Sequence, residues 1–364
     1  MEQNTTDINT TNAGLNTASL PPISTSPIPS SSQTQTTVLS RKPGFHLRPQ
    51  PPQHQLSSRL TPEALLFQTI HMGSVTIDPS NWHLVLTGLV ARPYALTLAQ
   101  LKELPRTTIA AFHECFGSPI SPPTTALWRV GNVEWTGVRL ATLLAYAQPL
   151  PSASYVWSSG LDAGEFAGVS ADSYQKDVPM GKALAPEVLV AYAMNGEPLG
   201  RERGGPVRLV VPGWFGTNST KWLCRLEVRE KRAPGPYTTR WYNREDPRGG
   251  SGALTPVWEV DVNSMITTPE DGAVVQEGDV LVEGWAWSAD EVVRVGVSTD
   301  GGQSYQMAVV ESRYEFSWQK FSLTLVLGLG EHVLIAQATS KNGTSQALSG
   351  YRNHVHSVNL QVCK

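Results

Sequence analysis

Alternation of apolar and polar residues predicts short β-strands along most of the chain. Residues 82–88 alternate before a glycine, and residues 155–160 and 207–211 have the same character; such runs are typical of strands. Residues 96–101 and 138–144 have helical spacing instead. Short strands mixed with short helices indicate an α+β domain in this part of the chain.

The α+β domain is expected to span residues 59–235. Near its start, Thr61 can cap a short helix in which Pro62 occupies the first turn. After residue 235 the chain becomes rich in Gly, Pro and Arg. We interpret residues 236–252 as a linker, because such a composition provides little apolar surface for a core.

After the linker the pattern changes to alternation without helical spacing. Val293, Val295 and Val297 are predicted to share one face of a strand, and the Asp-Gly-Gly run at residues 300–302 is a hairpin signal. Several short strands at regular spacing predict an all-β sandwich over residues 253–364.

Residues 1–58 are dominated by Thr, Ser, Asn, Gln and Pro. They are predicted to form a disordered tail, because they bury too little apolar surface to offset the entropy of ordering. Deleting residues 1–55 is then expected to change the thermal stability little. The first basic residue is Arg41, and no basic segment precedes an apolar stretch, so a signal peptide is not expected and the cytoplasm is the expected location.

Composition narrows the possible partners. The 364 residues are 40% hydrophobic and 16% charged, with a formal net charge of -3, so the chain has no electrostatic reason to bind nucleic acid or an anionic membrane. No apolar run approaches the ~20 residues of a membrane helix. Cys115, Cys224 and Cys363 are far apart, which argues against a disulfide framework and against C-x-x-C metal sites.

Two motifs carry the chemistry. Cys115 lies in the run His-Glu-Cys-Phe-Gly-Ser-Pro at residues 113–119, and residues 205–223 read Gly-Pro-Val-Arg-Leu-Val-Val-Pro-Gly-Trp-Phe-Gly-Thr-Asn-Ser-Thr-Lys-Trp-Leu. Alone, Cys115 would be interpreted as a buried structural thiol. Together the two motifs resemble the sulfite oxidase family of molybdenum enzymes, and the resemblance extends from about residue 61 to near the C-terminus.

The resemblance implies a molybdenum–molybdopterin cofactor, with Cys115 as the metal's protein ligand and as a catalytic residue. A soft thiolate suits that metal. It also implies that residues 253–364 form an immunoglobulin-like dimerisation domain, and hence a homodimer. The residues that the resemblance places at the cofactor are Phe67, Gln68, Thr69, Ile70, His71, Cys115, Asp162, Arg203, Arg208, Ser219, Thr220 and Lys221.

Several of these residue types suit a pterin with a phosphate group. Arginine and lysine donate charge-assisted hydrogen bonds to phosphate, and an ionised carboxylate such as Asp162 can only accept. Local sequence alone leaves Asp162 equally well explained as a turn residue before glycine. Tyr242 is the candidate for the family's catalytic tyrosine, with Tyr237 as a rival, and either could instead pack between domains.

The chain departs from sulfite oxidases at two arginines of the substrate-anion pocket and at two positions in the pterin-binding segment. Thr69 replaces one arginine, residues 118–120 read Ser-Pro-Ile where another is expected, Asn218 replaces a basic residue and Arg203 replaces a histidine. A desolvated dianion such as sulfite needs positive partners. The sequence therefore predicts retained cofactor binding with an altered substrate site.

The leading interpretation is a molybdenum-cofactor-dependent oxidoreductase that transfers an oxygen atom to or from a small substrate. Because no haem or flavin segment is recognisable in the chain, an external electron acceptor is expected. The alternative is a non-catalytic dimeric protein of the same family that binds the cofactor or a partner, and the departures at Thr69 and residues 118–120 motivate it.

Overall fold

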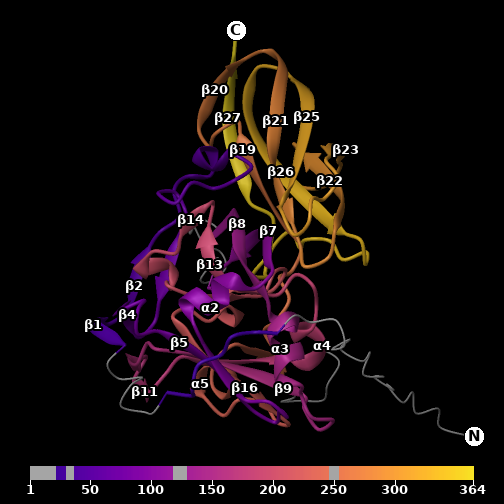
Figure 1. Cartoon of the computed structure of the whole chain (residues 1–364). Helices are drawn as coiled ribbons and strands as arrows, with labels where there is room; N and C mark the ends of the chain where they lie inside the picture. The colour runs from indigo at the N-terminus through magenta and orange to yellow at the C-terminus, as the bar shows by residue number, and fades with distance from the viewer. Residues whose placement is uncertain (1–21, 30–36, 118–128, 246–253) are drawn as a thin grey trace, which may run out of the picture.

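The computed structural model describes residues 22–29, 37–117, 129–245 and 254–364. It consists of a first domain and, stacked above it in Figure 1, a C-terminal β-domain. Both are built mostly from strands, and the described α-helices are short. The α+β prediction therefore holds only coarsely, for a mostly β first domain. The helices are α2 (Leu98–Glu103), α3 (Leu140–Ala147), α4 (Met180–Ala183) and α5 (Pro236–Thr239).

Two five-stranded sheets form most of the first domain. One has the order β12-β9-β16-β5-β6, in which β16 and β5 run parallel; the other has the order β14-β13-β8-β7, with β15 also paired to β13. Apolar residues of both sheets pack with α3 in one buried cluster. The strands are β5 (His83–Gly88), β6 (Tyr94–Thr97), β7 (Arg106–Glu114), β8 (Val130–Arg139), β9 (Tyr155–Gly160), β12 (Gln175–Pro179), β13 (Leu189–Met194), β14 (Glu197–Pro198), β15 (Arg208–Val210) and β16 (Leu223–Arg229).

Most local predictions in this domain are confirmed. The expected strands correspond to β5, β9 and β15, and the helix at residues 96–101 is α2, where Thr97 forms a capping box with Gln100. The short helix at Thr61 is wrong. Residues 62–66 make a single turn, and Thr61 Oγ1 accepts a hydrogen bond from Asn132 N at 3.0 Å instead.

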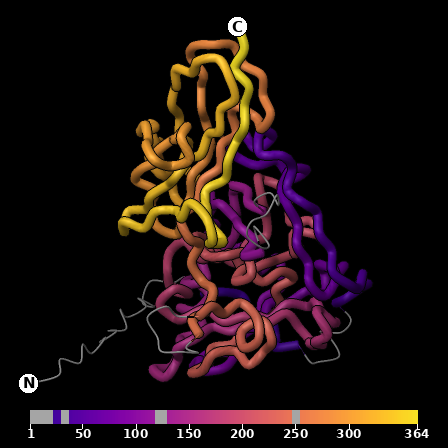
Figure 2. Tube along the Cα trace, turned by 180° about the vertical axis from the view of Figure 1, so that it is seen from behind, coloured from indigo at the N-terminus to yellow at the C-terminus, as the bar shows by residue number. Residues whose placement is uncertain are grey.

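Residues 37–56, which we call the N-terminal strap, overturn part of the disorder prediction. Strand β1 (Val38–Pro43) pairs with β4 (Gly73–Ile77), β2 (His46–Arg48) pairs with β3 (Gln68–Ile70), and a 3-10 turn follows at Gln53–Leu56. Figure 2 shows this indigo segment running along the first domain to the base of the β-domain. Strand β1 is mostly exposed, so backbone pairing rather than apolar burial orders it.

The C-terminal domain is built from two sheets around one apolar core. Their orders are β19-β21-β25-β24 and β20-β27-β26-β22-β23. Val295 and Val297 are buried as predicted, but Val293 is exposed because a bulge shifts the register between Val292 and Arg294. The strands are β19 (Asn263–Thr268), β20 (Ala273–Gln276), β21 (Gly278–Trp287), β22 (Val292–Ser298), β23 (Gln306–Met307), β24 (Val309–Val310), β25 (Gln319–Leu327), β26 (Gly330–Ser340) and β27 (Ser357–Cys363).

The predicted linker at residues 236–252 is only partly a linker. Its first half forms α5 and strand β17 (Asn243–Glu245), which pairs with β18 (Leu254–Pro256), and Tyr237 is buried against Met72 and Tyr174. These residues belong to the first domain, because their aromatic side chains complete its core. Residues 246–252 lie outside the described part of the chain.

The two domains are joined by backbone pairing as well as by side chains. Phe112 N donates to Phe316 O at 2.9 Å, and Phe316 N donates to Ala110 O at 3.1 Å, so a C-terminal-domain loop pairs with the outer edge of β7. Trp285 Nε1 donates to Leu56 O at 2.6 Å, which ties the strap to the same domain. The end of β7, where Cys115 follows, is therefore held from both domains.

Candidate active site

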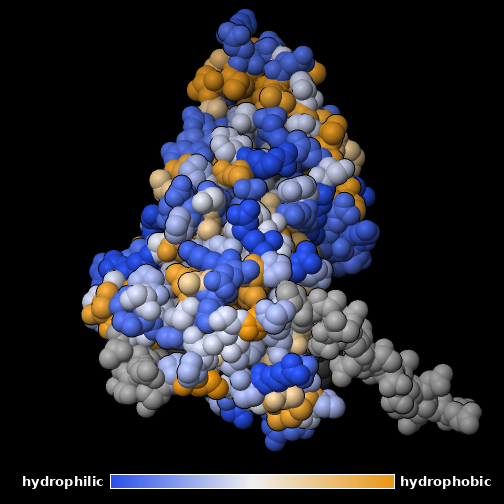
Figure 3. Space-filling model, viewed as in Figure 1, coloured by the Kyte–Doolittle hydropathy of each residue, from blue (hydrophilic) through white to orange (hydrophobic). Residues whose placement is uncertain are grey.

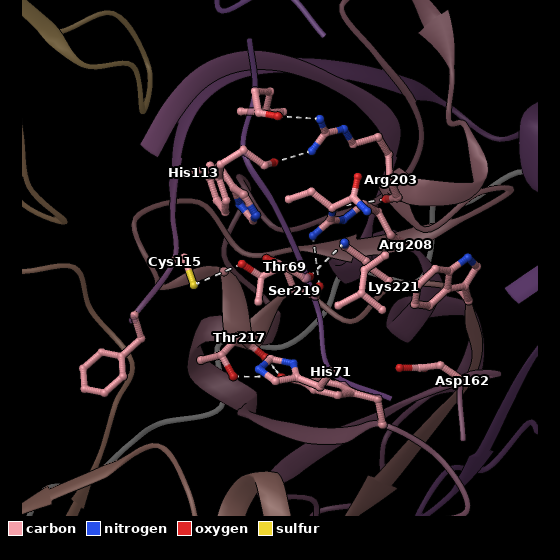
Figure 4. A pocket seen from close by; sticks show the side chains of 18 of the residues that line it. Thr69, His71, His113, Cys115, Asp162, Arg203, Arg208, Thr217, Ser219 and Lys221 are labelled. Carbon is pink, nitrogen blue, oxygen red and sulfur yellow. Dashed lines mark hydrogen bonds between the residues drawn. The ribbon is translucent and has the colours of Figure 1, made fainter. Parts of the chain in front are cut away.

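One cavity of about 750 Å³ in the first domain collects the candidate residues. Every predicted site residue lines it except Thr220. Figure 4 shows Cys115 and Asp162 at opposite sides, with Arg203, Arg208 and Lys221 between them. Residues of the 3-10 turns Arg201–Arg203 and Gly216–Asn218 also line the cavity, and the remaining short strands of the domain are β10 (Gly164–Phe166) and β11 (Val169–Ala171).

Cys115 follows directly after β7, so its position is set by a strand. Its backbone N donates to Arg129 O at 2.9 Å, and its Sγ lies 3.7 Å from Thr69 Oγ1. The thiol is free and partly exposed toward the cavity. Among the described residues, no three His, Cys, Asp or Glu side chains converge as a metal site. A metal bound through Cys115 would therefore need its other ligands from a cofactor.

Arg208 and Lys221 place positive charge in the cavity wall, and the nearby carboxylates of Asp162 and Glu202 compensate it only from beyond salt-bridge distance. Arg208 is buried; it donates to Arg203 O and Ser219 O and stacks on the Trp135 ring at 4.9 Å. Lys221 Nζ donates to Thr69 O and Glu202 O. Within the described part of the chain neither side chain forms a salt bridge. Because burying cations without a salt-bridge partner is costly, this arrangement fits an anionic group such as a phosphate.

Asp162 supplies the complementary acceptor at the far side of the cavity. Its side chain is 4% exposed, and Oδ1 has no hydrogen-bond partner among the described residues. Burial raises the pKa of Asp162 to about 7, although Lys221 and Arg41 partly offset it. An orphaned carboxylate that faces a cavity fits the amine-rich ring of a pterin.

Arg203 holds the cavity wall rather than facing an empty space. Its guanidinium donates to Glu63 at 2.8 Å, to Phe67 O at 2.6 Å and to Leu66 O at 2.8 Å. It therefore fixes the segment that continues into Gln68–Ile70. In that segment Gln68 donates to Glu202 Oε2 at 2.7 Å, while Phe67 and Ile70 are buried and form part of the apolar wall.

Tyr242 and His71 meet across the cavity, with the tyrosine Oη 2.9 Å from the imidazole Nε2. Burial, with Lys221 and Arg129 nearby, lowers the pKa of His71 to about 4, so the imidazole is neutral near pH 7. Burial also raises the pKa of Tyr242. The rival Tyr237 is 1% exposed and does not line the cavity, so the geometry favours Tyr242 as the catalytic candidate.

Two family models match the chain. The oxidoreductase molybdopterin binding domain covers residues 71–237, and the Mo-co oxidoreductase dimerisation domain covers residues 255–349. Sulfite oxidase from Arabidopsis thaliana is 30% identical over 282 residues, which are 70% of this chain and 72% of that protein.

The chain belongs to the sulfite oxidase family. Mitochondrial sulfite oxidase from Homo sapiens is 32% identical over 323 residues, covering 82% of this chain and 58% of that relative, so the chain spans little more than half of its length. The crystal structure of the sulfane dehydrogenase SoxCD from Paracoccus pantotrophus matches with a TM-score of 0.72 and 27% identity. That match covers 91% of this chain and 90% of the other.

The structure adds site residues that the sequence analysis did not select, two of which, His113 and Thr217, lie within the two motifs. His113, Tyr174 and Thr217 also line the cavity, and Tyr174 donates to Thr217 O at 2.7 Å. Gly216 allows the close approach of the His113 ring, because a Cβ at that position would lie 2.9 Å from His113 Nε2. His113 could have been found from strand alternation, since it lies two positions before Cys115 on one face.

Thr220 is the exception within the sulfite oxidase motif. Its side chain is buried, and its hydroxyl forms a 2.7 Å hydrogen bond with Ser158 outside the cavity. Ser219 and Lys221 line the cavity on either side of it. Thr220 therefore points away from the cavity, between two residues that face it.

We expect Asp162→Leu to stabilise the cofactor-free protein while weakening cofactor retention. Removing a buried carboxylate with an unpaired oxygen should raise the free energy of unfolding by about 1 kcal/mol, and the lost acceptor should lower pterin content. Urea denaturation and pterin fluorescence measure the two effects. Asp162→Asn, which keeps one acceptor oxygen, is the matched control and should retain more pterin. If Asp162→Leu retains as much pterin as the unmodified protein, Asp162 has no role in binding it.

Because of Lys221, we expect the free energy of unfolding of the cofactor-free protein to increase with pH. Burial, with Arg208 nearby, lowers the pKa of Lys221 from 10.5 to about 7. Between those values the unfolded chain binds a proton that the folded protein has lost, so the free energy of unfolding increases with pH. Urea denaturation at both ends of this window should show a smaller increase for Lys221→Met. An equal increase in both proteins would assign the pH dependence to other groups.

Proposed function

We propose that this protein is a molybdopterin-dependent oxidoreductase that transfers an oxygen atom to or from a small substrate. One observation carries the proposal: a thiol at the end of a strand shares one cavity with two buried cationic side chains that, among the described residues, form no salt bridge. When bound, the cofactor would supply two-electron chemistry, with water as the oxygen source for an oxidation. Two electrons and two protons would then leave, the electrons to an external acceptor.

The chain's own residues have separable roles in this proposal. Cys115 would hold the metal, while Arg208, Lys221 and Ser219 would bind the phosphate and Asp162 the pterin ring. The hydrogen bond between Tyr242 and neutral His71 would orient the tyrosine hydroxyl toward the substrate.

We propose a sulfur compound with little negative charge as the substrate, because the cation nearest the thiol, Arg129, already donates to Thr69 Oγ1 and Gly117 O. Thr69, which stands where sulfite oxidases carry an arginine, lies beside the thiol and receives a hydrogen bond from Arg129 at 3.3 Å. Phe116 and Tyr242 provide an aromatic wall nearby, with ring centroids 6.0 Å apart. The relatives are named sulfite oxidases, and the matching solved structure is named a sulfane dehydrogenase, so sulfur substrates come first in a screen.

The C-terminal domain is proposed to be an immunoglobulin-like sandwich that forms a homodimer. Exposed apolar residues support this: Val274, Leu281 and Val326 on its strands are all at least 47% exposed. Figure 3 shows apolar side chains gathered over its upper part. Among the described residues no helix is long and apolar enough to cross a bilayer. Separately, a cytoplasmic location is part of the proposal.

The test is metal and pterin analysis of protein from a host that makes the cofactor, followed by turnover with sulfite and with neutral sulfur compounds. About one molybdenum per chain with turnover of a neutral compound would support the full proposal. Faster turnover of sulfite would retain the enzyme and reject the substrate class. Protein that carries no molybdenum would favour the non-catalytic dimer instead.

A further inference from the structure

A side chain from the C-terminal domain reaches the residues around Cys115. Arg352 lies between β26 and β27 and is 16% exposed. Its Nη2 donates to Glu114 Oε1 at 2.5 Å and to Cys115 O at 3.0 Å, and its Nε donates to Phe116 O at 2.7 Å. One guanidinium therefore binds three consecutive residues, with the thiol-bearing residue in the middle.

The surroundings hold this guanidinium in one orientation. Its central carbon lies 5.1 Å from the Phe116 ring centroid and 4.3 Å from that of Phe215, within cation–π distance of both rings. The Glu114 carboxylate is fully buried, and its second oxygen accepts from Trp287 Nε1 at 2.7 Å. Because a planar guanidinium with several bonded donors has little freedom, Arg352 can act as a rigid support.

We propose that Arg352 is a positioning residue that sets the orientation of the Cys115 thiolate. The backbone N of Cys115 is bound by Arg129 O and its carbonyl by Arg352, so the peptide groups on both sides of its Cα are fixed. The direction of the Cα–Cβ bond follows from that backbone, and the contact of Sγ with Thr69 Oγ1 at 3.7 Å then favours one side-chain rotamer. The proposal rests on the proposed role of Cys115 as metal ligand, and it makes the C-terminal domain part of the active site rather than only a dimerisation module.

A purely structural role would use the same contacts to join the two domains, so the test must separate joining from positioning. Trp285→Phe is the matched control. It removes an interdomain hydrogen bond of 2.6 Å to Leu56 O, and none of its described contacts involves Cys115. Arg352→Gln removes the charge and most donors at the cysteine, whereas Arg352→Lys keeps the charge.

Two readouts apply to these variants. In molybdenum-loaded protein, Arg352→Gln should change the g values of the Mo(V) electron paramagnetic resonance signal. It should also lower kcat by about 10–100-fold, the usual cost of losing a partner of a metal ligand, with KM little changed. Arg352→Lys should recover part of kcat, and Trp285→Phe should leave the signal unchanged. In cofactor-free protein, iodoacetamide should alkylate Cys115 at a different rate in Arg352→Gln than in the unmodified protein or in Trp285→Phe.

Equal Mo(V) signals and equal alkylation rates in Arg352→Gln and Trp285→Phe would overturn the proposal and leave Arg352 as a domain contact. If Arg352→Gln does not fold, the decision passes to Arg352→Lys. Its single ammonium cannot satisfy three acceptors in the same geometry, so an unchanged signal and alkylation rate would reject positioning. If no protein binds molybdenum, the proposed function fails, yet the alkylation rates still report whether Arg352 orients the thiol.

Discussion

Replacing Cys115 with serine is expected to reduce turnover by more than about 100-fold, the upper end of what losing a partner behind a metal ligand costs. Cys115 is the cysteine that lines the cavity. Among the described residues no cluster of other metal ligands exists. Serine is nearly the same size, but its hydroxyl is a hard and weakly acidic ligand that suits molybdenum poorly.

Metal content, pterin content and turnover should be measured together for this variant. Pterin binding should survive in part, because the phosphate-binding cations and Asp162 are untouched, whereas metal-dependent turnover should disappear. Cys224→Ser is the matched control. Cys224 lies in β16, its Sγ donates to Ser159 O at 3.4 Å, and a serine hydroxyl can keep that hydrogen bond. Full turnover by Cys115→Ser, or an equal loss in Cys224→Ser, would remove Cys115 from the metal-binding role.

Removing residues 1–56 is expected to lower the free energy of unfolding by more than about 2 kcal/mol, on the scale of uncovering a single buried leucine. Leu56 is 2% exposed beneath Trp285, and the strap pairs with both β3 and β4. In addition, Arg48 donates to Leu66 O at 2.8 Å, and Arg41 donates to Leu161 O beside Asp162. Pterin retention should fall with stability, because the strap supports two walls of the cavity.

Chemical denaturation and pterin fluorescence of this truncation should be compared with those of a variant that lacks residues 1–21. The shorter deletion removes no residue that the structure describes. The shorter truncation should match the full chain in both measurements. If the longer truncation also matches the full chain, the strap contributes no stability and residues 1–58 behave as the composition alone predicts.

The strap shows why composition misled the sequence interpretation. Disorder was inferred from the lack of apolar residues, yet β1 needs few of them, because its backbone groups pair with β4 and its side chains face solvent. The β-bulge that exposes Val293 is a similar case, since one extra residue reverses the facing of a side chain without changing its chemistry.

The residues of the site were easier to predict from the sequence than the N-terminal strap or the side-chain directions at the β-bulge. Cys115, Arg208 and Lys221 were identified because their residue types match a demanding chemistry within recognisable motifs. Alternation along strand β7 could have added His113, because it lies two positions before Cys115 on the same face. Arg352 and Tyr174 could not be found in this way, because they reach the site from elements that only the three-dimensional fold brings near.

The pairing of Phe316 with β7 has a consequence for the behaviour of fragments in solution. Strand β7 is the last strand of its sheet, and the backbone groups of Ala110 and Phe112 on its outer side are satisfied by the C-terminal domain. A fragment that ends before residue 254 would expose those groups as an open β-edge flanked by apolar residues. Such edges recruit other chains, so the isolated first domain is expected to aggregate unless that edge is covered.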